Sequence, residues 1–481
     1  MTEDRSAAGR LDALCDDAED AARDTPLAVQ VAAIRDRLEE PLRVAIAGEV
    51  KVGKSTLLNA LVSERLAQTD AGECTRIVTW YREGLGYEVR AVRRDGTDVA
   101  LHHTREDGAL QIDLGDLGPD EIERLDVAWP SSALRRVTLI DTPGLSSLDD
   151  SGSARTRDFL ATEEHPSDAD AVIYLLRHLH RRDLEFLDAF LDRSVSSVSP
   201  VNAVAVLARA DEVGAGRLDA LESAARIAAR YRADSRLRSL CTAVVPVAGL
   251  VAETGRTLRE HEAADLRTLA GLPDDELDDL LLSADHFASD RESPVGTEAR
   301  RYLLRRFGMF GARYAVGAIR AGEAATAADL ARLFVDASGV RELEQLLEDH
   351  FLPRARALKA RAAIVALRAV VRALEEHAPD AAREIGTAIE EIEASSHEFA
   401  ELRLAHVVLS GTVAFTEEEV AELRRLTTAG TSAERAGLDP GESGDEVQRT
   451  ALAAVERWRA RGASPLADPE LCDACEVMAR S

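Results

Sequence analysis

No feature constrains this chain more than the segment Gly48-Glu49-Val50-Lys51-Val52-Gly53-Lys54-Ser55, which fits the pattern G-x-x-x-x-G-K-S. It lies between a short apolar run at 43–47 and a helical pattern that begins at Ser55. In that setting the backbone N–H groups of the loop and of the helix N-terminus form a cradle for phosphate. We expect Lys54 to pair with the β- and γ-phosphates of a nucleotide and the Ser55 hydroxyl to coordinate Mg²⁺.

The scarcity of lysine supports this interpretation. The chain has 481 residues and 59 Lys plus Arg, yet only three are lysine, and two of the three, Lys51 and Lys54, lie in this loop. A lysine ammonium group is a compact point charge that the planar guanidinium of arginine does not reproduce. The alternative, a chance glycine-rich turn between a strand and a helix, does not explain this placement.

Apolar segments that alternate with helical patterns predict an α/β domain over residues 41–250. Strands separated by helices form a mainly parallel sheet that is covered on both faces. An insert at 82–136 contains a predicted hairpin about Asp95-Gly96. The expected strands are 43–47, 77–81, 137–140, 171–176, 203–207 and 243–247.

Helical patterns dominate the rest of the chain. Residues 1–40 indicate two acidic, Ala-rich helices, and residues 251–481 indicate helices rich in Ala, Leu, Arg and Glu that are interrupted by prolines. We therefore expect residues 251–481 to form a helical bundle beside the α/β domain.

A second motif, Val137-Thr138-Leu139-Ile140-Asp141-Thr142-Pro143-Gly144, is an apolar strand that ends in D-T-P-G. Such an ending places Asp141 in the Mg²⁺ shell through a water molecule and the Gly144 N–H beside the γ-phosphate. In Gly72-Glu73-Cys74-Thr75-Arg76, Thr75 is the candidate switch threonine that binds the metal. The alternative is an ordinary threonine at the start of a strand.

The element expected to recognise the base is Ala208-Arg209-Ala210-Asp211, where guanine-binding proteins usually have N-K-x-D or T-K-x-D. Asp211 can accept hydrogen bonds from guanine N1–H and N2–H₂, and the Arg209 side chain can stack on the base. Ala208 offers no polar contact. Guanine is therefore favoured over adenine, although the motif is degenerate.

The predicted site comprises three sets of residues, and the loop at 245–249 adds backbone amides to the base pocket. The predicted nucleotide contacts are Gly48, Glu49, Val50, Lys51, Val52, Gly53, Lys54, Ser55, Thr56, Asp141, Gly144, Arg209, Asp211, Val247 and Ala248. The predicted metal ligands are Ser55, Thr75 and Asp141, and the predicted catalytic set is Lys51, Lys54, Ser55, Thr75 and Gly144.

The composition argues against several classes of protein. With 87 Asp plus Glu the formal charge is −28, whereas nucleic-acid binders need clustered Lys and Arg, and attachment to anionic lipid is weakened in the same way. Five scattered cysteines do not indicate a disulfide framework, and we expect neither a signal peptide nor a membrane-spanning stretch. The expected location is the cytoplasm, with peripheral attachment to the inner face of the plasma membrane left open.

Together, the segments GEVKVGKSTLLNAL, ECTRIVTW, DTPGLSSL, ARADEVGAGR and VVPVAGL, followed by a helical half, resemble a bacterial dynamin-like GTPase. RFGMFGARYAVGAIRAG at 306–322 and GLDP at 437–440 resemble in particular the mycobacterial isoniazid-inducible (IniC-like) subgroup. The resemblance implies a dynamin-type GTPase domain at 41–250 that hydrolyses GTP to GDP. It also implies an elongated all-α stalk in which residues 1–40 join residues 251–481. Head-to-head dimerisation across the nucleotide, membrane remodelling by fission or fusion, and a paralogous dynamin-like partner are implied as well.

The resemblance also bears on catalysis. Ras-like GTPases have a water-orienting Gln where this chain has Leu145, and dynamin-like proteins share that departure. Eukaryotic dynamins use a P-loop Gln and Ser where this chain has Val50 and Lys51. We predict that Lys51 supplies positive charge beside the β- and γ-phosphates, and the alternative is a solvated loop lysine.

Two segments are candidates for contact with lipid. Residues 300–322 carry six arginines and no acidic residue beside an apolar stripe. The alternative is a bundle helix whose arginines meet the acidic N-terminal helices. The apolar run 407–415, which precedes a capping box of Thr416 and Glu419, is either an insertion loop or a segment buried between helices.

Two further groups of residues have metal-ligand types but lack the spacing of a metal site. Cys472-x-x-Cys475 has no second ligand pair, and His178 and His180 have only Asp183 near them. We expect packing roles for both groups.

Three functions compete. The first is a mechanochemical GTPase at the cytoplasmic face of a membrane. The second is a GTP-gated interaction subunit of a hetero-oligomer, with little lipid activity of its own. The third, an Era-like ribosome-assembly GTPase, needs a basic RNA-binding domain that this sequence does not contain.

Overall fold

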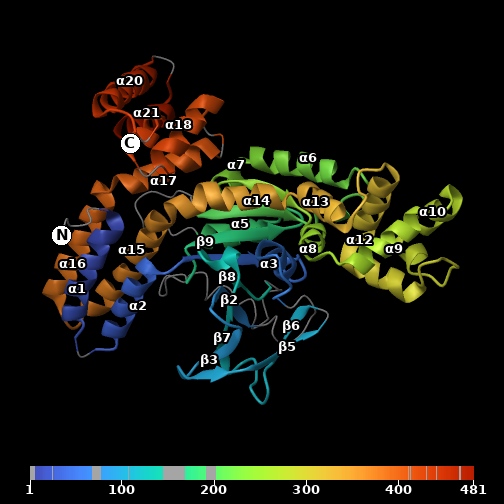
Figure 1. The fold of residues 1–481 in the computed structure, drawn as a ribbon. Coiled ribbons are helices and arrows are strands. Elements are labelled where there is room, and N and C mark those ends of the chain that lie inside the picture. The colour runs from blue at the N-terminus through green and yellow to red at the C-terminus, as the bar shows by residue number, and fades with distance from the viewer. Residues whose placement is uncertain are drawn as a thin grey trace.

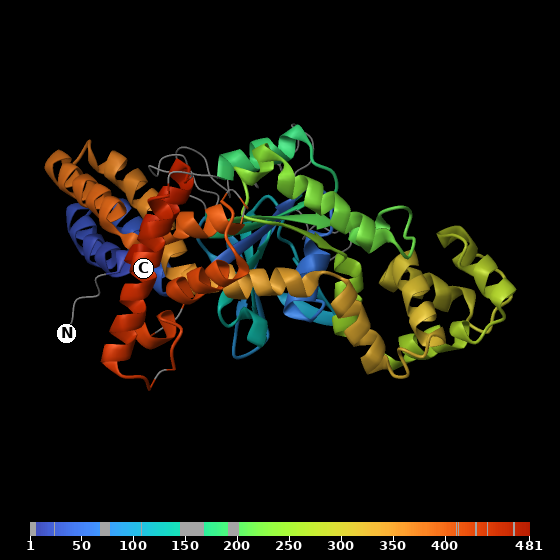
Figure 2. The same cartoon turned by 90° about the horizontal axis from the view of Figure 1, so that it is seen from above.

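A nine-stranded sheet forms the centre of the molecule, and helical groups extend from two opposite ends of it (Figures 1 and 2). The computed structural model describes residues 6–23, 25–67, 77–106, 108–144, 168–190, 202–409, 411, 413–428, 431–439, 441–464 and 467–481. Among the helices in these ranges, none combines the length and the apolar composition that a bilayer span requires.

The strand order across the sheet is β11-β10-β9-β1-β8-β2-β7-β3-β4. The five strands from β11 to β8 are mutually parallel, β2 is antiparallel to β8, and β3 and β4 form an antiparallel edge beyond β7. The predicted parallel sheet is confirmed for this central part. The strands are β1 Leu42–Gly48, β2 Val78–Glu83, β3 Glu88–Arg93, β4 Asp98–Ala100, β7 Ile122–Trp129, β8 Val137–Asp141, β9 Ala171–Leu176, β10 Ala203–Ala208 and β11 Val244–Val247.

Helices cover the two faces of this sheet because its central strands are apolar on both sides. β9 and β10 are buried along their whole length, as continuous apolar runs in parallel sheets usually are. Val44 and Ile46 face one core, and Ala45 and Ala47 face the other. The first core includes α3 Lys54–Val62 and α14 Val340–Leu346, and the second includes α5 Arg181–Phe190, α6 Ala220–Ala233 and α7 Ser235–Arg238. α13 Ala327–Ala337 contributes Val335 to the first core and Leu330 and Phe334 to the second.

The insert between β2 and β8 extends the sheet. The predicted hairpin is confirmed as β3 and β4, with Gly96 at φ 81° in the turn and the Asp95 Oδ1 atom accepting from Thr97 N at 3.0 Å. A second hairpin, β5 His102–Glu106 and β6 Ala109–Asp113, lies outside the main sheet.

The N-terminal helices pack against C-terminal ones at one end of the sheet (Figure 1). α1 Ala7–Ala21 and α2 Leu27–Glu39 contact α15 Ala355–Leu374, and α16 Pro379–Ser395 completes this bundle. Their apolar stripes form one continuous core with the sheet face of Val44. The predicted joining of the two ends of the chain is therefore confirmed.

The helices after residue 251 do not all belong to that bundle, which corrects the expectation of a single one. A group at the opposite end of the sheet packs on the core of Ala45, as Figure 2 shows from above. Another group surrounds the buried Trp458. The first group is α9 Glu260–Ala270, α10 Asp274–Leu280, α11 Ala284–Phe287 and α12 Thr297–Arg320, and it follows α8 Gly249–Thr257. The second is α17 His397–Leu409, α18 Glu417–Thr428, α19 Ser432–Arg435, α20 Gly444–Gly462 and α21 Pro469–Arg480.

A buried ion pair joins the N-terminal bundle to the sheet. The Arg37 guanidinium contacts Asp170 Oδ1 at 2.7 Å, and Asp170 Oδ2 accepts from Arg43 N at 2.8 Å. The third lysine of the chain, Lys359, donates from Nζ to the Glu40 carbonyl oxygen at 2.8 Å. These bonds connect α2 and α15 to the beginning of β1 and to the residue before β9.

We predict that Asp170→Asn lowers the free energy of unfolding by about 3 kcal/mol, because it removes the carboxylate charge that pairs with the buried Arg37 guanidinium. Urea denaturation followed by circular dichroism measures this change. Asp380→Asn is the matched control, because its pair with Arg383 is exposed and should contribute little. Equal effects of the two substitutions would contradict the structural role of the buried pair.

Candidate nucleotide-binding site

The glycines of the loop between β1 and α3 have a steric reason to be glycine. Gly48 has φ 143°, and a Cβ at this position would lie 2.4 Å from the Leu175 carbonyl oxygen of β9. Gly53 has φ 111° and immediately precedes α3. Only glycine combines these conformations with such a close approach to the neighbouring strand. The loop therefore curls around the C-terminal end of β1 and leads into the helix N-terminus.

Lys54 lies inside this loop with its side chain buried. Its Nζ atom donates to the carbonyl oxygens of Gly48 at 3.2 Å and Glu49 at 3.1 Å. Burial lowers the pKa of this ammonium group, and the nearby Asp141 carboxylate opposes that shift. No carboxylate of the described residues forms an ion pair with it. A buried cation without a paired anion favours the binding of a negatively charged ligand.

Ser55 and Asp141 meet beside Lys54. The Ser55 Oγ atom donates to Asp141 Oδ2 at 2.7 Å, whereas the buried Asp141 Oδ1 has no hydrogen-bond partner within the described ranges. Burial raises the pKa of Asp141, while Lys54 and the Ser55 hydroxyl lower it. A hydroxyl and a carboxylate with an unsatisfied oxygen are donors that suit Mg²⁺, so the residues fit the predicted metal.

The D-T-P-G motif lies directly against the loop. A Cβ on Gly144 would lie 2.4 Å from Val50 Cγ2 and 2.9 Å from Val50 N. The Thr142 hydroxyl donates to the Ile46 carbonyl oxygen of β1 at 3.0 Å, which fixes the motif to the central strand. Thr75 and Leu145 lie outside the described residues.

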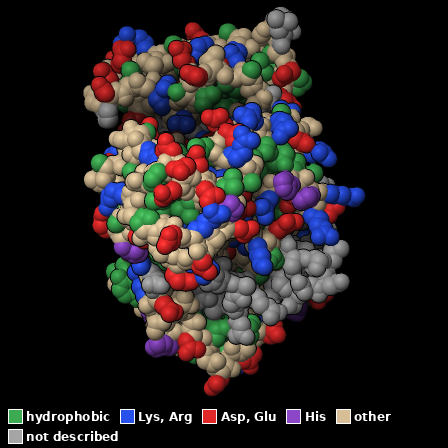
Figure 3. Space-filling view, turned by 90° about the vertical axis from the view of Figure 1, so that its right-hand side faces the viewer, with side chains coloured by type: hydrophobic (Ala, Val, Ile, Leu, Met, Phe, Trp, Pro, Cys, Tyr) green, Lys and Arg blue, Asp and Glu red, His purple; other side chains and the backbone are tan. Residues whose placement is uncertain are grey.

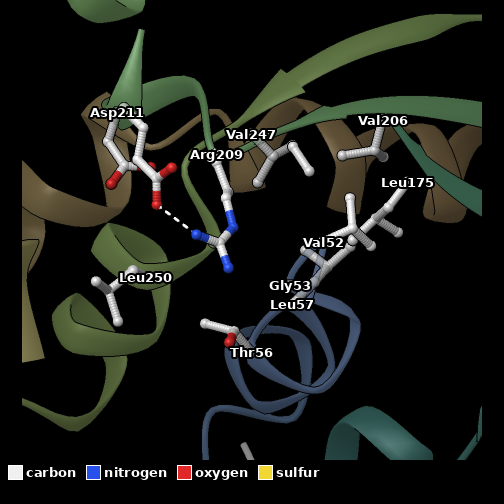
Figure 4. Close-up of a pocket in the computed structure, with 13 residues that line it drawn as sticks. Val52, Gly53, Thr56, Leu57, Leu175, Val206, Arg209, Asp211, Val247 and Leu250 are labelled. Carbon is white, nitrogen blue, oxygen red and sulfur yellow. Dashed lines mark hydrogen bonds and ion pairs between the residues drawn. The ribbon is translucent and has the colours of Figure 1, made fainter. Parts of the chain in front are cut away.

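The predicted base-recognition residues line a pocket beside the loop (Figure 4). Asp211 is buried there, and burial together with Glu212 raises the pKa of its carboxyl group to about 6, while Arg209 and Arg177 lower it. The pocket is lined by Val52, Gly53, Thr56, Leu57, Leu175, Val206, Ala208, Arg209, Asp211, Glu212, Val247, Gly249 and Leu250.

Arg209 connects the base pocket to the phosphate loop. Its Nη2 atom donates to the Lys51 carbonyl oxygen, and its Nη1 atom contacts Glu212 Oε1 at 2.7 Å. Glu212 also accepts from Arg177 Nη2 at 2.7 Å, so one carboxylate holds two guanidinium groups. Arg209 has φ 53° and Lys51 has φ 61°, both unusual for residues other than glycine.

Glu212 and Arg177 were missed in the sequence. The spacing of Arg209 and Glu212, three residues apart, was the available signal for the first of them, whereas no local pattern indicates Arg177. The Arg209 side chain crosses the pocket toward Thr56, as Figure 4 shows, which is compatible with stacking on a base.

One predicted contact is corrected. The Ala248 N–H donates to the Ser338 carbonyl oxygen at 2.8 Å, because the turn after α13 packs against the end of β11. This amide is therefore engaged within the fold. Val247 lines the pocket as expected, and Gly249 and Leu250 line it in place of Ala248.

The arginine-rich helix α12 has a structural role that neither prediction anticipated. The buried Arg300 donates to the carbonyl oxygens of Phe287 at 2.9 Å and Ser289 at 2.6 Å, and Arg306 pairs with Glu262 at 2.7 Å. These partners belong to the segment from α9 to α12, not to lipid or to the N-terminal helices. Figure 3 shows acidic and basic side chains interspersed at this end of the molecule.

The described residues of the segment 407–415, which exclude 410 and 412, contact the group around Trp458. Residues 407–409 belong to α17, Val413 is buried, and the Phe415 ring lies 5.7 Å from the Trp458 ring. The Arg461 guanidinium stacks on Phe415 and donates to the Ala414 carbonyl oxygen at 2.9 Å. These contacts favour the alternative of a segment packed between helices over an insertion loop. The predicted capping box is present, with Glu419 accepting from Thr416 N at 2.8 Å.

The remaining candidates have packing roles. Cys475 is buried on α21, and among the described residues no group of three His, Cys, Asp or Glu side chains could hold a metal ion. Asp183 accepts from the Tyr174 hydroxyl and from His180 N, both at 2.7 Å, and thereby fixes the beginning of α5. Burial raises the pKa of this carboxyl group.

Known proteins are similar to this chain both in the α/β domain and over nearly its whole length. A family model described as "50S ribosome-binding GTPase" matches residues 43–205. The "Isoniazid-induced protein IniC" of Mycobacterium tuberculosis is 42% identical over 456 residues, which cover 94% of this chain and 91% of that protein.

Shorter similarities point in the same direction. The "Isoniazid-induced protein IniA" of the same organism is 34% identical over 120 residues, which cover 24% of this chain and 19% of that protein. A "Bacterial dynamin-like protein" of Nostoc punctiforme is 29% identical over 116 residues, which cover 22% of this chain and 17% of that protein. Because similarity to IniC extends over nearly the whole chain, including its helical half, this protein belongs to the bacterial dynamin-like GTPases, in the family of the isoniazid-induced protein IniC.

Proposed function

We propose that this GTPase uses Mg²⁺-dependent hydrolysis of GTP to drive head dimerisation and stalk movement, and thereby remodels a membrane at its cytoplasmic face. The observation that carries the proposal is the placement of two sets of residues at one edge of the sheet. Lys54, Ser55 and Asp141 lie at the ends of β1 and β8, and Arg209 links them to Asp211 at the end of β10.

In this proposal the loop binds the phosphates. Lys54 pairs with the β- and γ-phosphates, and the loop amides donate to them. Ser55 and Asp141, together with Thr75, hold Mg²⁺, which neutralises charge on the phosphate oxygens when it is bound. The Gly144 N–H donates to the γ-phosphate in this proposal, and the close approach of Gly144 to Val50 keeps it near the loop.

Asp211 and Arg209 recognise the base. The Asp211 carboxylate accepts hydrogen bonds from guanine N1–H and N2–H₂, and adenine offers no matching pair of donors. Arg209 stacks on the base, and Glu212 holds its guanidinium in place. In many guanine-binding motifs a polar residue at position 208 would help to hold this loop next to the phosphate loop. Here the residue is Ala208, and the hydrogen bond from Arg209 to the Lys51 carbonyl oxygen connects the two loops instead.

A second candidate function is a GTP-gated subunit of a hetero-oligomer with a paralogous dynamin-like protein. One observation favours it: in the two segments that were candidates for lipid contact, 300–322 and 407–415, described side chains such as Arg300 and Phe415 have partners within the fold. The similarity of this chain to both IniC and IniA of one organism supports the existence of such paralogues.

The experiment that separates these functions measures GTP turnover and flotation with anionic and with neutral liposomes. Stimulation of turnover by liposomes, with co-flotation of the protein, supports membrane remodelling by the isolated chain. Nucleotide-dependent association with a paralogue, without an effect of lipid, supports the second function. Lys54→Ala is the negative control, because it removes the buried cation that the phosphates require. GTP turnover that persists in this variant would overturn the proposed site.

We predict that Lys51→Gln lowers the turnover number about tenfold or more and changes GTP affinity little. The Lys51 side chain is exposed and makes no hydrogen bond within the described residues, so its charge is available to the transition state. Lys51→Arg is the control that restores the charge at the same position. Single-turnover hydrolysis measures the effect. A rate for Lys51→Gln equal to that of the unmodified protein would identify Lys51 as a solvated loop residue.

We also predict that affinity for GDP falls about tenfold between pH 7.5 and pH 5, because the pKa of Asp211 is raised to about 6. Below that pH the carboxyl group is protonated and no longer accepts both guanine donors. Calorimetric titration measures the profile, with Asp211→Asn as the reference for titration of the nucleotide phosphate itself. Parallel profiles for the two proteins would exclude Asp211 as the titrating contact.

A further inference from the structure

The helix α12 is interrupted at Gly308. This residue has φ 63° and ψ 178°, a conformation that is essentially restricted to glycine, whereas the residues on either side are helical. The break divides α12 into a first segment at 297–307 and a second segment at 309–320. It lies within the segment RFGMFGARYAVGAIRAG at 306–322, which belongs neither to the phosphate loop nor to the base-recognition motif.

The first segment is fixed to α8 and α9. The Arg306 Nε atom contacts Glu262 Oε1 at 2.7 Å, and its Nη2 atom donates to Thr257 Oγ1 at 2.9 Å. The Thr254 hydroxyl donates to the Arg306 carbonyl oxygen. Thr254 and Thr257 belong to α8, which begins at the pocket residue Gly249. The end of the first segment is therefore tied to the helix that follows the base pocket.

The second segment is fixed to the loop that follows Asp211. The Arg313 Nη1 atom donates to the Gly216 carbonyl oxygen at 2.7 Å, and its Nη2 atom donates to the Leu281 carbonyl oxygen at 2.8 Å. A Cβ on Gly216 would lie 3.2 Å from Phe310 N, so the loop backbone packs directly on the first turn of this segment. Arg313 thus clamps the base-recognition loop to the turn after α10.

The break itself faces the base pocket. A Cβ at position 308 would lie 3.7 Å from Asp211 Oδ2 and 3.6 Å from Leu250 Cδ2. Both of these residues line the pocket. The interruption of α12 therefore brings its backbone alongside the carboxylate that is expected to recognise guanine.

We propose that the break at Gly308 and the Arg313 clamp are positioning elements for guanine recognition. They hold the Asp211 loop from outside the pocket, in a chain whose recognition motif has Ala208 where a polar residue would stabilise the loop from within. Gly308 and Arg313 act through Asp211 and do not touch the nucleotide. The inference rests on the proposed contact between Asp211 and guanine.

The test compares the affinities of GDP and IDP, which differ only in the 2-amino group that Asp211 is expected to bind. In Gly308→Ala the altered backbone displaces Asp211, so we expect the preference for GDP over IDP to fall roughly tenfold. Gly317→Ala is the matched control on the same helix, because a Cβ at Gly317 meets no atom within 4 Å. This control should keep the preference of the unmodified protein.

Arg313→Gln is a second variant, and it leaves the strained backbone at Gly308 unchanged. It removes the charged fork that holds Gly216 and Leu281, and the same loss of preference is expected. A general loss of stability would lower the fraction of active protein for both nucleotides and leave their affinity ratio unchanged. Folded variants at both positions with an unchanged GDP to IDP ratio would overturn the inference.

The unmodified protein distinguishes failure of this inference from failure of the proposed site. If it shows no preference for GDP over IDP, the proposed contact of Asp211 with guanine is wrong. Gly308 and Arg313 then have no base contact to position. If it shows the preference and Gly308→Ala and Arg313→Gln retain it, only the positioning role is wrong.

Discussion

The buried ammonium group of Lys54 is the interaction on which the rest of the site depends. Two carbonyl oxygens of its own loop hold it, and the described residues supply no carboxylate to pair with it. That arrangement requires the loop to curl tightly, which in turn requires glycine at position 48 against β9. It also requires β1 to lie between β8 and β9, because these strands bring Asp141 and Leu175 to the loop.

The pocket that is proposed to bind the base is stabilised by contacts from three directions. Arg209 reaches the phosphate loop, Glu212 reaches Arg177 beyond the end of β9, and α12 supports the loop after Asp211. A motif that looks degenerate as a linear pattern is therefore supported by residues that are distant in sequence. The same helices that cover the second core of the sheet also shape the site.

The sequence predicted the features that depend on local pattern. The strands, the loop around Lys54 and the D-T-P-G motif were accessible from periodicity and spacing, whereas the joining of the two ends of the chain was expected from the family resemblance. The arginines of α12 were expected to meet lipid or the N-terminal helices. A pattern of charges in the sequence does not reveal that a guanidinium group donates hydrogen bonds to carbonyl oxygens inside the fold. Ala248 was misjudged because its amide is bonded to a distant turn, and Gly308 because a glycine inside a helical pattern does not reveal its φ angle.

A crystal structure of the protein with Mg²⁺ and GDP would show whether Lys54 and Asp211 bind the two ends of one nucleotide. We predict that the phosphates lie over Lys54, that Ser55 Oγ leaves Asp141 for the metal, and that guanine N1 and N2 lie within hydrogen-bond distance of Asp211. A nucleotide bound elsewhere on the chain, or a base that does not contact Asp211, would contradict this prediction.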